Sequence, residues 1–106
     1  MMRLDLSRPP DTPLKVLCLG AHSDDIEIGC GGTVLTLADR YGEALEIRWV
    51  VLSGDGPRRQ EAEESAKRFL AKVRRSACQV HTFRDGFFPQ SWGEVKEVFE
   101  SLKAHY

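Results

Sequence analysis

Three short apolar runs alternate with longer segments of helical pattern, and this alternation constrains the fold of the 106-residue chain more than any other feature. Strands are expected at residues 15–20, 46–52 and 79–83. Parallel strands joined by helices of this length require right-handed crossovers. We therefore expect an α/β fold, a Rossmann-like three-layer αβα arrangement with a mainly parallel sheet.

The segments between and after these strands carry apolar residues at helical spacing. They predict helices over about 31–41, 57–75 and 92–103, with Gly42 ending the first. The expected buried positions are Val34, Leu35, Ala38 and Tyr41 in the first helix, Ala62, Ala66, Phe69, Leu70 and Val73 in the second, and Val95, Val98, Phe99 and Leu102 in the third.

Length and charge indicate one small domain, residues 1–106, with a flexible Pro-rich lead-in at 1–13. A net charge of −1 argues against nucleic acid as a partner. Apolar runs fall short of the ~18–20 residues of a membrane span. The three cysteines, Cys18, Cys30 and Cys78, lack CxxC spacing and do not suggest a disulfide framework. With no signal sequence visible, we expect a cytoplasmic protein.

Polar, glycine-bearing loops follow each expected strand, at residues 22–32, 53–58 and 84–89. The carboxyl ends of parallel strands meet at one edge of a sheet, and ligands of open α/β folds bind there. We therefore expect these three loops to gather around a site.

The first of these loops lies in VLCLGAHSDDIEIGCGGT, residues 16–33, and carries the residue types of a metal site. His22 and Asp25 are close enough for one turn to point both at an ion, and nitrogen plus oxygen ligation suits zinc or a neighbouring first-row metal. Asp24 could then act as general base towards a metal-bound water. The alternative is that the aspartates cap the helix and that His22 is a hydrogen-bonded loop residue.

Two other motifs fit less well. GCGGTV departs from the dinucleotide fingerprint GxGxxG, because Val34 stands where a third glycine is required. A paired acid after the first strand is also found in phospho-acceptor receiver domains, but the candidate acceptor Asp55 follows the second strand rather than the third.

The segment AHSDDIEIGCGGT resembles the AHPDD motif and GCGGT-type turn of the PIG-L or LmbE-like de-N-acetylases. RRQEAEESAKRFL resembles the RxxE helix of that family through Arg58 and Glu61, and FRDGFF resembles its DG loop. The resemblance implies a zinc-dependent hydrolase that removes acetyl from an N-acetylated amino sugar, typically a conjugate of N-acetylglucosamine.

Carried over residue by residue, the resemblance makes His22 and Asp25 zinc ligands and Asp24 the base that activates a zinc-bound water. It makes Arg58 a candidate to hold sugar or phosphate oxygens of the substrate. Asp85 is a candidate to orient a substrate hydroxyl, and the alternative is that it caps the DG turn. Glu27 is expected to support the fold.

The chain departs from the family pattern in two places. Ser23 replaces the family's proline, a mild change. The family's third zinc ligand, a histidine in a downstream HPDH-like motif, has no counterpart, since His81 falls in an expected strand and His105 ends the last helix. The resemblance thus covers the first half of the family domain, and we expect this chain alone to be inactive.

A half sheet would leave an unpaired edge and an uncovered apolar face, so we expect a homo-oligomer. The alternative to an enzyme is a non-catalytic α/β module that binds a metal or a sugar. Ligand types leave zinc and iron both open, and the sequence leaves the aglycone of the substrate open.

Overall fold

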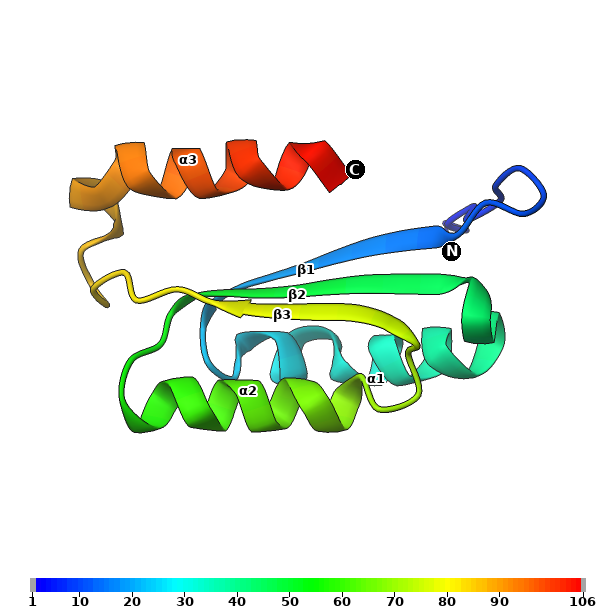
Figure 1. Cartoon of the computed structure of the whole chain (residues 1–106), viewed down its shortest axis with the longest axis horizontal. Helices are drawn as coiled ribbons and strands as arrows, with labels where there is room; N and C mark the ends of the chain where they lie inside the picture. The colour runs from blue at the N-terminus through cyan, green and yellow to red at the C-terminus, as the bar shows by residue number, and fades with distance from the viewer. Residues whose placement is uncertain (1, 106) are drawn as a thin grey trace.

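The chain folds into a parallel sheet with helices on both faces. The computed structural model describes residues 2–105, in which the elements are β1 Leu14–His22, α1 Asp25–Tyr41, β2 Leu45–Ser53, α2 Pro57–Phe69, β3 Arg75–Val80 and α3 Trp92–Leu102. The strands lie in the order β1–β2–β3 and all pair in parallel. Helices α1 and α2 cover one face and α3 lies on the other (Figure 1). The expected α/β fold with a parallel sheet is confirmed, and it is compatible with a Rossmann-like arrangement.

The core lies between the sheet and the α1–α2 layer. Alternate residues of the central strand β2 face these helices, and Leu45, Ile47, Trp49 and Val51 are each 0% exposed. Small residues on α2 let the helix approach the sheet closely, as Ala62 and others on its inner face are buried. The near-continuous apolar run of β2 is what a strand covered on both faces requires.

Strand β1 is covered less completely than its apolar sequence predicts. Cys18 faces the core and is 6% exposed, whereas Leu19, on the side of α3, is 48% exposed. A cavity of about 190 Å³ lies between β1 and α3, and Leu17, Leu19 and Phe99 help to line it. Among residues 2–105, β1 pairs only with β2, so its outer edge carries no neighbouring strand.

Helix α1 begins earlier than the sequence pattern predicts. It starts at Asp25 rather than near Gly31, and the backbone at Cys30 leaves helical geometry with φ −148° and ψ 16°. A Cβ at Gly31 would lie 2.6 Å from Cε1 of Phe69, so only glycine permits this approach of α1 to α2. Leu35, expected inside, is 47% exposed. The helical pattern of apolar residues does not extend through the glycine cluster, so it did not predict the first turns of α1. Tertiary packing stabilises these turns.

The connection from α2 to β3 also differs from the prediction. Helix α2 ends at Phe69, and Leu70 and Val73 are buried in a turn closed by the Val73 N–H donating to the Leu70 carbonyl at 2.9 Å. Strand β3 therefore starts at Arg75, four residues earlier than expected, and ends at Val80. Leu70 and Val73 lie in this turn but continue the helical spacing of apolar residues, so the sequence pattern predicted a helix end later than the observed one.

The lead-in, residues 2–13, contains no helix or strand. The guanidinium of Arg8 lies 5.2 Å from the ring centroid of Tyr41 at the end of α1, and its Nε donates to the Thr12 carbonyl at 2.7 Å. Within residues 2–105, none of the helices has the length and apolar character needed to cross a bilayer.

Candidate metal site

The three polar loops meet at the carboxyl edge of the sheet, as the sequence predicts. His22 ends β1 opposite Ser53, which ends β2, and Ser53 also bridges to Thr82 beyond β3. Only two residues separate His22 from Asp25 at the start of α1. The side chain that closes strand β1 is therefore held directly beside the first turn of the helix.

Two carboxylates bracket the imidazole of His22. Its Nδ1 lies 3.3 Å from Oδ2 of Asp25, and its Nε2 lies 2.7 Å from Oδ1 of Asp85. The backbone N–H of His22 also donates to Oδ2 of Asp25 at 2.8 Å, which fixes that carboxylate against the loop. The ring of Phe88 makes an edge contact with the imidazole at a centroid distance of 6.0 Å. The imidazole is thus held from both sides in one orientation.

These contacts change the pKa values of His22 and Asp85. The hydrogen bond with Asp85 raises the pKa of His22, and Asp25 adds to this effect while partial burial opposes it. The same bond lowers the pKa of Asp85, with a smaller contribution from the positive charge of Arg58. Both side chains of the shorter pair are substantially exposed, at 40% for His22 and 58% for Asp85. Solvent therefore screens the pair, and its main effect is on orientation.

The His22 and Asp25 atoms fit two neighbouring positions of a zinc site. With bonds of about 2.1 Å to nitrogen and oxygen, two ligands of a tetrahedral zinc stand roughly 3.4 Å apart. The observed separation of Nδ1 and Oδ2 is 3.3 Å. The second nitrogen of a metal-binding histidine commonly donates to a carboxylate, which is the arrangement of Nε2 and Asp85. Within residues 2–105, however, no group of three or more His, Cys, Asp or Glu side chains is arranged to hold a metal ion.

Arg58 and Asp85 come together beside this site. Both line a cavity of about 240 Å³, together with Asp55, Arg84 and other residues of the second and third loops. Arg58 lies in the first turn of α2, where its N–H donates to the carbonyl of Asp55 at 3.1 Å. The cavity offers both charges to a polar ligand, and the structure brings together two residues that the sequence separates widely.

Asp24 lies on a different cavity. It is exposed, its Oδ1 accepts a hydrogen bond from Ser23 at 3.1 Å, and it lines a cavity of about 310 Å³ between α1 and α2. Glu27 and Glu61 line the same cavity, and both carboxylate oxygens of Glu27 are buried without a hydrogen-bond partner among the described residues. The sequence did not predict this acidic cavity. The helical spacing of Asp24 and Glu27 was its only local signal.

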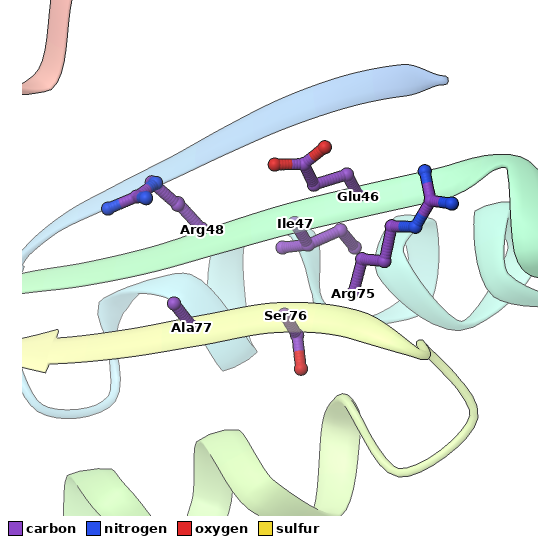
Figure 2. Close-up of a pocket in the computed structure, with 6 residues that line it drawn as sticks. All are labelled: Glu46, Ile47, Arg48, Arg75, Ser76 and Ala77. Carbon is purple, nitrogen blue, oxygen red and sulfur yellow. The ribbon is translucent and has the colours of Figure 1, made fainter. Parts of the chain in front are cut away.

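The remaining histidines lie away from His22. Nδ1 of His105 lies 3.0 Å from a guanidinium nitrogen of Arg48. This pair lies towards the amino ends of the strands, where Glu46, Arg48 and Arg75 help to line a cavity of about 290 Å³ (Figure 2). The ring of His81 contacts Phe83 at a centroid distance of 5.9 Å, and burial lowers the pKa of His81. Neither histidine joins the candidate site.

Comparisons with known proteins do not identify this chain. No family model matches this chain, and no solved structure matches it. Within residues 2–105, the fold and the site define an α/β protein with a three-stranded parallel sheet and a histidine held between two carboxylates at the carboxyl edge of the sheet.

Proposed function

We propose that this chain carries part of the catalytic site of a zinc-dependent hydrolase that removes acetyl from an N-acetylated amino sugar, as its resemblance to PIG-L or LmbE-like de-N-acetylases implies. The observation that supports it most is the separation of 3.3 Å between Nδ1 of His22 and Oδ2 of Asp25, combined with the hydrogen bond of 2.7 Å from the opposite ring nitrogen to Asp85. These atoms supply two of the three protein ligands that a catalytic zinc site usually has, together with a carboxylate that orients one of them.

In this proposal His22 and Asp25 bind the metal. A bound zinc ion would supply Lewis acidity, lowering the pKa of a water towards ~7 and polarising the acetamide carbonyl. Asp85 fixes the orientation and tautomer of His22, because Nε2 must carry the proton that it donates. A substrate hydroxyl is a second partner for Asp85, since its side chain also faces the cavity of about 240 Å³.

Asp24 is the proposed general base, which takes a proton from the attacking water. It follows His22 by two residues and is exposed, but its carboxylate lines the cavity between α1 and α2, so this role requires the side chain to turn towards His22. Arg58, on the wall shared with Asp85, is proposed to hold sugar or phosphate oxygens of the substrate, because a guanidinium donates two parallel hydrogen bonds to such groups.

We propose further that residues 2–105 form the first half of a larger domain. The strand order β1–β2–β3, with β1 at an outer edge, matches one half of a doubly wound sheet in which the next strand would pair with β1. A third protein ligand for zinc would then come from another polypeptide segment or a second copy. Catalysis by this chain alone is expected to be very weak, because a catalytic zinc site usually has three protein ligands and His22 and Asp25 supply two.

Zinc titration by calorimetry tests the site. We compare the unaltered chain with His22→Ala, Asp25→Asn and the control Asp39→Asn, whose exposed side chain pairs with Lys72 in a different part of the molecule. Zinc binding lost in the first two variants and kept in the control is the expected result. Zinc binding that is indifferent to His22 would overturn the metal site.

Hydrolysis is tested separately by release of free amine from an N-acetylglucosaminide, with Asp24→Asn as the matched variant. A trace of activity that disappears in the variant is expected if Asp24 is the base. Activity that survives in the variant contradicts that assignment. Zinc binding through His22 without any turnover, even when a second chain completes the site, would favour a binding module over an enzyme.

A further inference from the structure

A charged cavity lies towards the amino ends of β2 and β3, at the opposite end of the sheet from His22. Glu46, Arg48 and Arg75 help to line this cavity of about 290 Å³. Side chains alternate along β2, so Glu46 and Arg48 stand on the face away from the α1–α2 layer, and Arg75 lies opposite Glu46 on β3. Figure 2 shows Glu46 between the two arginines. The cavity therefore presents two guanidinium groups and one carboxylate.

The register of the strands leaves room for a small ligand between the arginines. Ala77, whose side chain is a single methyl group, stands opposite Arg48 and two positions after Arg75. Neighbouring strands lie about 4.8 Å apart and residues two positions apart along a strand about 6.6 Å, so the Cα atoms of the two arginines are roughly 8 Å apart. Both guanidinium groups can therefore reach one ligand in this cavity.

The charged groups of this cavity lack partners. Nε of Arg48 is buried without a hydrogen-bond partner among residues 2–105, although a terminal nitrogen of the same guanidinium lies 3.0 Å from Nδ1 of His105. In the same part of the chain, the side chains of Glu46 and Arg75 form neither a hydrogen bond nor an ion pair. A buried donor without a partner is unfavourable, so an acceptor in this cavity would stabilise Arg48.

The charge around the cavity is positive. Lys15 lies opposite Glu46 on β1, and its Nζ donates to the carbonyl of His105 at 3.3 Å. One carboxylate thus faces the cations of Lys15, Arg48 and Arg75. Helix α3 ends short of the amino ends of the strands on this face (Figure 1), and Arg75 is exposed. An anion from solvent can therefore approach the cavity.

We propose that this cavity binds hydrogen phosphate, an oxyanion that keeps a proton of its own at neutral pH. Its unprotonated oxygens accept charge-assisted hydrogen bonds from Arg48 and Arg75, since guanidinium groups suit phosphate oxygens. Its O–H donates to Glu46, a carboxylate that would repel a fully ionised anion. Sulfate resembles phosphate in shape but has no proton to donate, so Glu46 favours phosphate over sulfate. This binding does not depend on the proposed hydrolase function.

NMR titration of the isotope-labelled chain tests the site at about pH 7.5, with inorganic phosphate, sulfate and methyl phosphate at equal ionic strength. The backbone amides of residues 46–48 and 75–77 and the Nε–H of Arg48 report binding. We expect saturable shifts with phosphate and an affinity about tenfold higher than for sulfate, the contribution of one hydrogen bond to a charged group. Methyl phosphate loses its last proton above a pKa of about 6, so it should bind as weakly as sulfate.

Variants of the lining residues provide the comparison. Arg48→Gln and Arg75→Gln should each weaken phosphate binding about tenfold or more. Arg74→Gln is the matched control and should bind phosphate like the unaltered chain, because Arg74 is the neighbouring residue and pairs instead with Glu43 at 2.7 Å. In Glu46→Gln the preference for phosphate over sulfate should disappear, because the amide can donate to sulfate.

Three outcomes would overturn the proposal. The first is the absence of a saturable shift with phosphate in the unaltered chain. The second is binding of sulfate or methyl phosphate as tight as that of phosphate, which would remove the role of Glu46. The third is an equal loss of phosphate affinity in Arg74→Gln and Arg75→Gln, which would mean that phosphate responds to overall charge rather than to this cavity.

Discussion

Replacing Asp85 by Asn tests whether this carboxylate orients the His22 imidazole for a metal. The substitution keeps the size of the side chain and removes the charge that meets Nε2 of His22 at 2.7 Å. Carboxylate partners of metal-binding histidines contribute about 10–100-fold to metal affinity. The two side chains are 40% and 58% exposed, so solvent screening places the expected effect at the lower end. We expect zinc affinity to fall about 10-fold.

The assay is a calorimetric zinc titration at about pH 8, on the alkaline side of the ordinary histidine pKa. Asp55→Asn is the matched control, because Asp55 lines the same cavity as Asp85. As the pH is lowered, the difference between Asp85→Asn and the unaltered chain should narrow. Asp85 is the main cause of the raised pKa of His22, and therefore also favours the proton that competes with the metal. Equal affinities for both variants and the unaltered chain at the higher pH would refute the orienting role.

Three further predictions concern stability and assembly. Gly31→Ala should destabilise the fold by about 1–3 kcal/mol, since the added Cβ would lie 2.6 Å from the ring of Phe69 on α2. Gly32→Ala should instead stabilise α1 by about 0.5–1 kcal/mol, because a Cβ there meets nothing within 4 Å. Equal melting temperatures of the two variants would contradict this contrast. The pKa of His22 is raised in the folded state, so the folded protein holds a proton that the unfolded chain releases. The free energy of unfolding should therefore fall as pH rises from 6.5 through the raised pKa, which urea titrations at several pH values measure. The same pH dependence in Asp85→Asn would contradict the pair of His22 and Asp85 as its source. The open edge of β1 should drive self-association of the chain. Leu19 on β1 is 48% exposed, and Leu19→Lys should shift sedimentation equilibrium towards monomer. An unaltered chain that is already monomeric would contradict this prediction.

Local pattern was sufficient to predict the architecture. Continuous apolar residues in 46–52 and helical spacing in 57–69 report burial directly, so the α/β alternation and the parallel sheet could be predicted from sequence. The pairing of His22 with Asp25 was equally local, because residues separated by three positions meet in any tight turn that opens a helix. Element ends were predicted less well. At Gly31 and Leu70, packing between α1, α2 and the sheet decides where the backbone bends.

The amino-acid sequence by itself determined the strand–helix order, the edge of the sheet where the polar loops gather and the neighbouring positions of His22 and Asp25. Only the tertiary structure decided that Asp85, 63 residues away, holds the second nitrogen of His22, and that Asp24 faces another cavity. Contacts within one turn follow from local backbone geometry, whereas contacts between distant residues depend on strand register and helix packing, which side chains throughout the core set together.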